Sequence, residues 1–382
     1  GEDLVEINCH GGIYLVKKIF DLVISGGAYG IDWSEFSKCF VGATAEKEQT
    51  ALDLIQNEAL QEIPNAKTKL CAKVLIDQYS GALSYRLSEL IEKTAKLESL
   101  CDENSQPDVS GKFASVLSSI SADFKYLIST AEFGLSITEP QKIVIIGKPN
   151  VGKSTLINTL LGIDRVIVHH EPGTTRDPIS EFISIKGIPL NLIDTAGVRK
   201  TNHIVEQKGI EITNELILNS NKLILLFDKS MPLEDDDIDL FNFTVSVLKD
   251  SNKNISRKLM NRQLIPVLSK IDLPSRLNTQ QLDNMFQQTN GMFRKSSITN
   301  ISAATGEGVA ELENKIVSEF KDFINYSPGK PIIFKNRQFD LLFAAYEKIE
   351  ELICLFEKHS NINVYLAVLK ETKANLFNCL NN

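Results

Sequence analysis

Residues 147–155 have the composition and spacing of a phosphate-binding loop. They read Gly-Lys-Pro-Asn-Val-Gly-Lys-Ser-Thr, which matches GxxxxGK[ST], and they follow a strand-like apolar strip at 142–146. The glycines let backbone N–H groups close around a phosphate at the amino end of a helix, where the helix dipole favours negative charge. Lys153 would reach the β and γ phosphates, and the Ser154 hydroxyl would bind Mg²⁺. An ordinary tight turn before a helix is the alternative, but the full spacing favours a phosphate site.

Three motifs behind this loop point to a guanine nucleotide. Asp194 begins Asp-Thr-Ala-Gly at the end of a second strip, which places a carboxylate for the Mg²⁺ water shell and a glycine N–H for the γ-phosphate. Asp272 ends Ser-Lys-Ile-Asp behind the strip at 264–268, where it can accept hydrogens from guanine N1 and N2 that adenine does not offer. The Ser-Ala-Ala at 302–304 then supplies a backbone N–H to guanine O6. Each motif alone fits a plain loop equally well, but their order predicts a GTPase.

The predicted GTP-binding residues therefore lie on several loops. They are Asn150, Val151, Gly152, Lys153, Ser154, Thr155, His169, Thr174, Thr175, Asp194, Thr195, Ala196, Gly197, Ser269, Lys270, Asp272, Ser302, Ala303 and Ala304. Ser269 departs from the common pattern, because GTPases usually have an asparagine there whose longer side chain braces the base loop against the phosphate loop. We expect a reduced affinity for guanine, with the discrimination by Asp272 retained.

The segment Gly-Thr-Thr-Arg-Asp at 173–177 is the expected first switch. Thr175 would complete the Mg²⁺ shell together with Ser154 once γ-phosphate is present. Ras-like enzymes carry a water-orienting Gln just after the second-switch glycine, but here Val198 follows Gly197. An apolar side chain cannot orient water, so hydrolysis needs another carboxylate or amide and an additional positive charge.

Composition limits the remaining function classes. The chain has 382 residues, 43% of them hydrophobic, which predicts two or three domains with real cores. Its 41 Lys and Arg against 49 Asp and Glu give a net charge of -8, so direct nucleic-acid binding is a weak hypothesis. No apolar run approaches the roughly 18 residues that cross a bilayer, and six cysteines lie far apart with no CxxC spacing. We expect a soluble protein of a reducing compartment, without membrane contact and with an incomplete amino-terminal end.

The elements that must position these residues change character along the chain. Helical periodicity runs from 65 to 133, and a polar interruption at 102–111 divides it into two helices. From 141 short apolar strips alternate with helix-length segments, which predicts a parallel α/β sheet. A linker at 326–331 precedes a further helical stretch at 337–358. The first 45 residues, with one strand and one helix before Gly26, are too few for a complete domain.

These motifs, together with Val-Glu-Gln-Lys-Gly-Ile at 205–210, resemble the MnmE (TrmE) tRNA-modification GTPase family. The likeness covers nearly the whole chain, since Gly-Glu-Asp-Leu-Val-Glu at 1–6 and Cys-His-Gly-Gly at 9–12 look like the end of that family's folate-binding domain. The resemblance implies an α/β plus all-α fold, in which a P-loop GTPase domain is inserted into a helical domain and preceded by the remnant of an α+β folate-binding domain. It implies a partial folate-binding-like and dimerisation domain at 1–45, helical parts at 46–138 and 326–382, and a G domain at 139–325. Der-type GTPases share Gly-Thr-Thr-Arg-Asp but carry two tandem G domains.

The resemblance also implies a catalytic arrangement. In the family a K⁺ ion beside the phosphates supplies the charge of an arginine finger, and G domains that pair across a dimer complete its binding loop. The K⁺ residues carried over by match are Asn150, His169, Glu171 and Thr174. Glu206 matches the carboxylate that positions the attacking water, so the implied catalytic residues are Glu206, Lys153 and Thr175, with Mg²⁺ held by Ser154 and Thr175. Asn150 could instead merely stabilise a turn, and Glu206 could be an ordinary surface carboxylate.

The family partners with MnmG, an FAD and NADH enzyme. Together they add an aminomethyl or carboxymethylaminomethyl group to the wobble uridine of certain tRNAs, with one carbon from a tetrahydrofolate derivative. The resemblance thus implies a homodimer formed through the amino-terminal domain and transiently through G domains, tRNA contact through the complex, and a bacterial cytoplasmic location or, alternatively, a mitochondrion or other organelle.

The folate site is where this chain departs from the family. Of its folate-contacting positions Glu6 is retained, whereas the lysine-bearing segment is replaced at 40–45 and the family ending Cys-(Ile/Leu/Val)-Gly-Lys is replaced by Cys379-Leu380-Asn381-Asn382. Losing two lysines removes partners for the folate carboxylates. Cys379 is either functional or a buried apolar residue. A regulatory or assembly GTPase of MnmE ancestry without one-carbon chemistry is therefore the alternative function, and nucleotide binding without turnover is a third.

Overall fold

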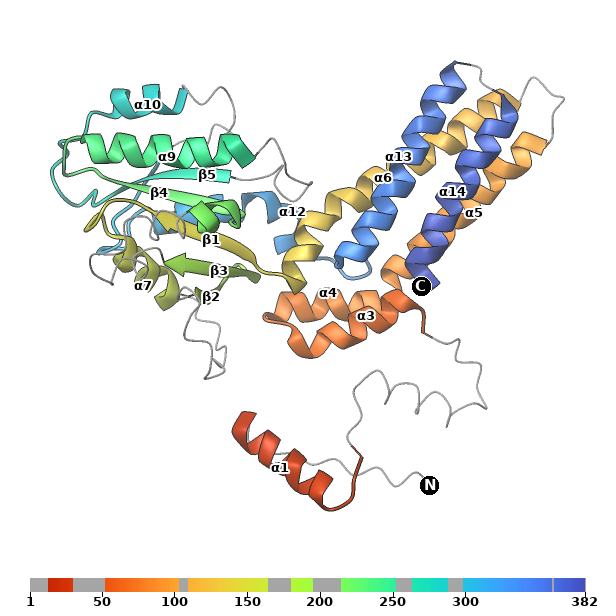
Figure 1. The fold of residues 1–382 in the computed structure, drawn as a ribbon, viewed down its shortest axis with the longest axis horizontal. Coiled ribbons are helices and arrows are strands. Elements are labelled where there is room, and N and C mark those ends of the chain that lie inside the picture. The colour runs from red at the N-terminus through yellow and green to blue at the C-terminus, as the bar shows by residue number, and fades with distance from the viewer. Residues whose placement is uncertain are drawn as a thin grey trace.

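The computed structural model describes residues 13–29, 52–102, 109–163, 180–194, 214–251, 263–287, 298–358 and 361–381. Within these residues an α/β part with one sheet lies beside an elongated bundle of helices (Figure 1). None of the helices in these ranges is long and apolar enough to span a membrane.

The sheet has the parallel centre that the apolar strips predict. Its strands are β1 (Gln141–Ile146), β2 (Ser180–Ile185), β3 (Ile188–Asp194), β4 (Lys222–Asp228), β5 (Gln263–Ser269) and β6 (Thr299–Asn300). They lie in the order β2-β3-β1-β4-β5-β6, and every neighbouring pair is parallel except the antiparallel pair β2 and β3. The carboxyl end of β1 therefore has the ends of β3 and β4 on either side of it.

Side chains alternate between the two faces of the sheet. Flanking helices are α7 (Lys153–Ile163), α9 (Asp235–Ser251), α10 (Thr279–Gln287) and α11 (Val309–Ile316). Ile143 and Ile145 of β1 belong to one buried cluster with residues of α7 and α11, whereas Val144 and Ile146 belong to another with residues of α9 and α10. Because strand side chains alternate with period 2, a sheet covered on both faces produces the continuous apolar strips of the sequence.

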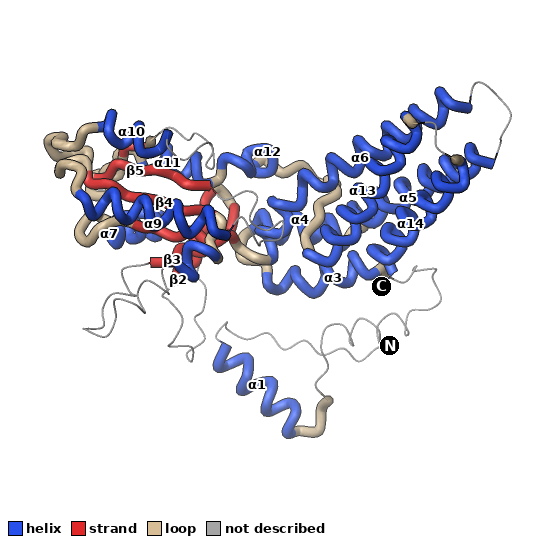
Figure 2. Tube along the Cα trace, turned by 45° about the horizontal axis from the view of Figure 1, so that its top comes forward, coloured by secondary structure: helices blue, strands red, loops and turns tan. Residues whose placement is uncertain are grey.

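Helices from before and after the sheet share one core. They are α3 (Leu54–Glu62), α4 (Lys69–Tyr79), α5 (Ala82–Asp102), α6 (Val109–Thr138), α12 (Lys321–Ile324), α13 (Asn336–Glu357) and α14 (Ile362–Asn381), with 3₁₀ turns at Ile63–Asn65 and Ser318–Phe320. No described residue of α1 (Ile13–Ser25) belongs to this core. Among them α5, α6, α13 and α14 pack side by side (Figure 2). Arg337 of α13 donates to both carboxylate oxygens of Glu58 in α3, at 2.8 and 3.0 Å, which ties α3 to this bundle.

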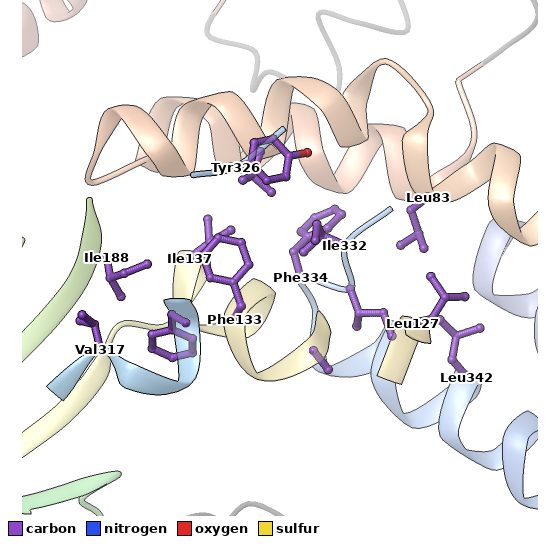
Figure 3. Packing of buried hydrophobic residues seen from close by; sticks show 14 of the residues in the cluster. Leu83, Leu127, Phe133, Ile137, Ile188, Val317, Tyr326, Ile332, Phe334 and Leu342 are labelled. Atoms are coloured by element: carbon purple, nitrogen blue, oxygen red, sulfur yellow. The ribbon is translucent and has the colours of Figure 1, made fainter. Parts of the chain in front are cut away.

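The bundle and the α/β part are joined by apolar packing. The ring of Phe133 in α6 stacks on that of Phe323 in α12, with centroids 4.3 Å apart. Figure 3 shows Ile188 of β3 near Ile137 of α6, within a buried cluster that continues through Phe334 into the bundle. At a second contact the Thr68 hydroxyl donates to the carbonyl oxygen of Gly187, in the β2–β3 turn, at 2.7 Å.

Several expectations about elements need correction. The stretch 65–133 contains α4, α5 and most of α6 instead of two helices, because Ser80 and Gly81 end α4 before α5 begins. Gly81 has a left-handed φ of 97°, which favours glycine. The sheet is not wholly parallel, since β2 lies antiparallel on its edge. The helix before Gly26 is confirmed as α1, whereas the strand expected before it lies outside the described residues.

The predicted linker at 326–331 has no helix or strand, but it is not a free tether. The Tyr326 side chain is buried, and its hydroxyl lies 3.3 Å from the carbonyl oxygen of Lys330. Burial, together with a hydrogen bond to Asp77, raises the pKa of Tyr326 well above its usual range. Asp77 also accepts from the Gly329 N–H at 3.1 Å, so α4 holds this segment in place.

Candidate nucleotide site

The predicted nucleotide residues meet at one edge of the sheet. The phosphate loop leaves the end of β1, Asp194 is the last residue of β3, and Ser269 is the last residue of β5. Strand register puts Ile145 beside Asp194 and Asp228 beside Ser269. Because the carboxyl ends of parallel strands lie together, motifs far apart in the sequence converge here, as is usual for ligand sites in α/β sheets.

The phosphate loop needs its small and turn-forming residues. Asn150 and Gly152 have left-handed φ values of 62° and 105°, a region that asparagine tolerates and glycine adopts freely. A side chain on Gly147 would place Cβ 2.8 Å from Val151 Cγ1 and 2.9 Å from the carbonyl oxygen of Leu226. Asn150 therefore does shape the turn, and its exposed side chain is also available to a ligand.

Lys153 begins α7 and is buried within the loop. Its Nζ donates to the carbonyl oxygens of Gly147, at 2.8 Å, and Lys148, at 2.7 Å. An ammonium held by the loop's own carbonyls is placed to meet a phosphate that the loop encloses. The first-turn N–H groups of α7 lack intrahelical acceptors and face the same ligand.

The described residues fit a Mg²⁺ ion in part. The Ser154 side chain is exposed in the first turn of α7, and its hydroxyl makes no hydrogen bond to the described part of the chain. Magnesium prefers such oxygen donors and keeps several waters. No group of three or more His, Cys, Asp or Glu within the described ranges could hold a metal ion. Thr175, the second predicted Mg²⁺ ligand, lies outside these ranges.

Ser269 does brace the base loop, contrary to the expectation from its length. Its buried hydroxyl lies 2.7 Å from the carbonyl oxygen of Val151 in the phosphate loop and 3.1 Å from that of Phe227. The shorter side chain reaches because the two loops approach closely at this point. The affinity for guanine stays a prediction, but its proposed structural cause is wrong.

Asp228 is a site residue that the sequence reasoning missed. Its Oδ2 accepts from Lys270 Nζ at 2.6 Å, and its Oδ1 accepts from the Ser230 hydroxyl at 2.6 Å. Burial opposes ionisation of Asp228, but the hydrogen bonds from Lys270 and Ser230 outweigh it, and the pKa lies below its usual value. Lys270 has a left-handed φ of 58°, so the ion pair fixes a constrained residue next to Asp272. The signal was an aspartate at the end of an apolar strip beside the base motif.

The loop at 302–304 is held by hydrogen bonds to the residues that follow it and to α7. Ser302 is buried, its N–H donates to the carbonyl oxygen of Glu307 at 2.9 Å, and its hydroxyl accepts from the Thr305 N–H at 3.2 Å. The Thr159 hydroxyl of α7 donates to the carbonyl oxygen of Ala303 at 2.8 Å. Thr159, which sequence reasoning also missed, thus links the base-binding loop to the helix that begins at the phosphate loop.

Other predicted site residues lie outside the described residues. They are Glu6, His169, Glu171, Thr174, Thr175, Thr195, Ala196, Gly197 and Glu206, and of Asp194 only the backbone is described. The catalytic carboxylate, the first switch and most of the K⁺ set therefore remain predictions from sequence.

Cys379 lies inside the helical bundle, far along the chain from the nucleotide loops. Its side chain is fully buried, and burial raises the pKa of its thiol to about 12. Arg337 donates to the carbonyl oxygens of Asn378, at 3.1 Å, and Cys379, at 3.0 Å, so the end of α14 is held against α13. This environment favours the interpretation of Cys379 as a packing residue.

Comparison with known proteins adds family relationships to this geometry. A family model described as a 50S ribosome-binding GTPase matches residues 142–268. The tRNA modification GTPase MnmE of Clostridioides difficile is 33% identical over 366 residues, which cover 94% of this chain and 73% of that protein. Its counterpart from Thermotoga maritima is 33% identical over 361 residues, covering 92% and 74%. The G domain of the FeoB iron transporter of T. maritima aligns with a TM-score of 0.31 at 25% identity, covering 47% of this chain and 99% of that domain, and a score this low supports no conclusion about the fold. From the identity and coverage of these relatives, the chain belongs to the MnmE family of tRNA modification GTPases.

Proposed function

We propose that this chain is a K⁺-stimulated GTP hydrolase that acts with MnmG in modification of the tRNA wobble uridine, by addition of a carboxymethylaminomethyl-type group at C5. The observation that supports it best is the direct tie between the base loop and the phosphate loop, from Ser269 to Val151. A phosphate loop alone would serve any nucleotide, whereas this tie joins the segment that carries Asp272 to the proposed phosphate loop. Recognition of the guanine base is thereby coupled to binding of the phosphates.

The hydrolytic step is assigned residue by residue. Lys153 holds the β and γ phosphates, and Ser154 and Thr175 hold Mg²⁺. Glu206 positions the attacking water, because Val198 stands where Ras-like enzymes have a water-orienting glutamine. When bound, K⁺ supplies the charge of an arginine finger beside Asn150, His169, Glu171 and Thr174. The chain is proposed to form a homodimer through its amino-terminal domain, and its G domains pair transiently during turnover.

The domain arrangement proposed for this function places the G domain, at 139–325, within a helical domain formed by 46–138 and 326–382. The packing of α13 and α14 on α5 and α6 supports it, because segments on both sides of the sheet build one bundle. Switch movements would pass through this bundle to the tRNA-modifying complex, with tRNA contacted mainly through MnmG. A remnant of a folate-binding domain at 1–45 completes the proposal.

A second function is favoured by one observation. The resemblance to the family implies a folate site, but the lysine-bearing segment of that site is replaced at 40–45 in this chain. Loss of that lysine removes a partner for the folate carboxylates. A regulatory or assembly GTPase of MnmE ancestry that has lost one-carbon transfer is therefore the alternative.

Two measurements separate these functions and test the first. Glu206→Ala should spare GTP binding and slow hydrolysis, because water positioning matters only on the way to the transition state, and hydrolysis at the parent rate would remove that assignment. Titration of 5-formyl-tetrahydrofolate into the full chain, with a wobble-uridine assay in the presence of MnmG, addresses the one-carbon step. Micromolar folate binding with modification supports the tRNA-modifying function. Normal GTP turnover without either supports the regulatory one.

A further inference from the structure

The phosphate loop is tied to the amino end of α9 by a lysine outside the predicted site. Lys148 directly follows the first glycine of the loop, and its Nζ lies 2.7 Å from Glu234 Oε2 and 2.8 Å from Asp237 Oδ2. The side chain of Lys148 is 16% exposed and that of Asp237 only 6%. A lysine with this little exposure between two carboxylates has a defined position, unlike the mobile lysines of an open surface.

The two carboxylates are not interchangeable. Asp237 Oδ2 also accepts the Glu234 N–H at 3.1 Å, which places it at the start of α9, where a helix favours negative charge. The Glu234 side chain is about half exposed to solvent. Burial alone would lower the pKa of Lys148, but hydrogen bonds to Asp237 and Glu234 outweigh it and raise that pKa, so the ammonium stays charged. Asp237 is therefore the main partner, and α9 is the rigid body to which the loop is attached.

The same residue serves Lys153 through its backbone. The carbonyl oxygen of Lys148 accepts from Lys153 Nζ at 2.7 Å, so the side chain of one loop lysine fixes the carbonyl that holds the other. A chain of contacts thus runs from α9 through Asp237 and Lys148 to Lys153. Lys153 is the group assigned to the β and γ phosphates, and its placement depends on where residue 148 is held.

Charge adds a second consequence. One ammonium against two carboxylates leaves the group with a net charge of about -1, and removal of Lys148 would make it about -2 beside a loop that must accept a polyphosphate. An unpaired carboxylate as buried as Asp237 is costly in itself and repels an incoming anion. Lys148 therefore both restrains the loop and neutralises an acidic helix start that would oppose the ligand.

We infer that Lys148, through Asp237, is a positioning residue that sets the nucleotide affinity of the phosphate loop. The inference rests on the proposed GTPase function and adds to it a residue that touches no phosphate. Because the loop encloses the phosphates in the ground state and the transition state alike, loss of the tie should weaken binding with little effect on the chemical step.

The test compares Lys148→Met, Lys148→Arg, Asp237→Asn and the double variant Lys148→Met/Asp237→Asn in the full chain. Lys142→Met is the matched control, because Lys142 is an exposed lysine at the opposite end of β1 and its loss changes the net charge equally. Affinity for GDP is measured by fluorescence titration with a labelled GDP. KM and kcat for GTP are measured at a temperature where circular dichroism shows every variant folded.

Lys148→Met should weaken GDP binding about tenfold or more and raise KM for GTP similarly, with kcat within about twofold of the parent. Lys148→Arg should restore affinity to within about threefold, since a guanidinium can bridge two carboxylates. The double variant should bind better than Lys148→Met alone, because no buried carboxylate is left unpaired, so the two changes should be clearly non-additive. Lys142→Met should match the parent.

Parent-like GDP affinity in Lys148→Met would overturn the inference, and so would additivity of the two changes or an equal loss in Lys142→Met. A fall in kcat at constant KM would overturn it too, since that would place Lys148 in the chemical step. Absence of GDP binding by the parent would overturn the proposed function, and the inference with it.

Discussion

At the scale of single residues, the nucleotide loops are held by the hydroxyl groups of Ser269 and Thr159 and by ion pairs. Ser269 binds the phosphate loop, Thr159 binds the loop at 302–304, and Asp228 binds Lys270, two residues before the predicted guanine-binding residue Asp272. The Ser269 and Asp228 contacts join segments at the ends of different strands, and the Thr159 contact joins α7 to the loop at 302–304. We therefore expect the loss of one contact to affect both the base loop and the phosphate loop.

Ser269→Ala should destabilise the protein and weaken its grip on nucleotide. The change removes a buried hydroxyl and leaves the carbonyl oxygen of Val151 without this donor, which costs about 1–3 kcal/mol. Urea unfolding and the dissociation rate of GDP measure the two effects. Ser84→Ala is the control, because Ser84 Oγ is buried without a hydrogen-bond partner among the described residues and its removal should be neutral or stabilising. Equal behaviour of the two variants would contradict the brace.

Asp272→Ala should lower affinity for GDP by about 10-fold to 100-fold, since two hydrogen bonds to a charged acceptor are lost. Binding of ADP should be unchanged and weak, because adenine has no N1 or N2 hydrogen to offer Asp272. Isothermal titration of both nucleotides into the parent and the variant measures the difference. If GDP affinity does not fall, guanine is not read by this carboxylate.

At the scale of elements, the sequence predicted the strands that are buried on both faces. The strips at 142–146 and 264–268 match β1 and β5 to within one residue at each end, because a continuous apolar run is a strong local signal. β6 has only two residues, and β2 lies on the sheet edge, so neither leaves a run of that kind. The break at Gly81 was missed because apolar spacing continues across it, and only the left-handed backbone reveals the turn.

The site itself was predictable where chemistry is encoded in a motif and not where it depends on packing. Lys153, Ser269 and Asp272 were identified from spacing alone. Asp228 and Thr159 carry no motif, and their roles depend on the register of β4 beside β5 and on the packing of α7. The sequence does not show how closely the phosphate loop and the base loop approach, so it could not predict that a serine can replace an asparagine there.

Because Cys379 of α14 is buried, we expect its thiol to react slowly with alkylating reagents. Its pKa of about 12 leaves almost no thiolate at pH 8, whereas an ordinary cysteine near 8.5 is partly ionised. Iodoacetamide at pH 8 should therefore label the exposed Cys354 and leave Cys379 unlabelled, as read by peptide mass spectrometry. Labelling of both in urea is the control for detection. Rapid labelling of Cys379 in the native protein would contradict its packing role.

Folding raises the pKa of Cys379, which sets the direction of its contribution to pH-dependent stability. That contribution should be fully present below about pH 8.5, the pKa of an unfolded cysteine, and be lost as the pH rises toward the folded value. Cys379→Ser should flatten this part of the pH profile of urea unfolding.

At the scale of the whole molecule, α6, which precedes the sheet in the sequence, closely contacts the segment that follows the sheet. A Cβ on Gly134 of α6 would lie 1.9 Å from the carbonyl oxygen of Ile333 and 2.5 Å from Ile332 Cγ2. Glycine is required there because the backbone of α6 lies against both the backbone of Ile333 and the side chain of Ile332, in the segment that leads into α13. Packing of the helical bundle thus depends on the segment that follows the sheet and leads into α13.

Gly134→Ala should destabilise the molecule by about 1–3 kcal/mol or more, since neither backbone can move aside without disturbing the core. Gly162→Ala in α7 is the matched control, because a Cβ there meets no atom within 4 Å and alanine favours a helix by up to about 1 kcal/mol. Thermal and urea unfolding of both variants should move in opposite directions. A neutral Gly134→Ala would show that the two segments are not packed as described.

The most direct test of the proposed function is phosphate release from GTP and from ATP with Mg²⁺, in K⁺ and in Na⁺ at matched ionic strength. We predict that the parent hydrolyses GTP faster in K⁺, that equal ATP does not compete, and that Lys153→Ala neither binds nor hydrolyses GTP because the phosphates lose their ammonium. Competition by equal ATP, or parent-like turnover by Lys153→Ala, would contradict the assignment of this site to GTP hydrolysis. Equal rates in the two salts would remove K⁺ from it.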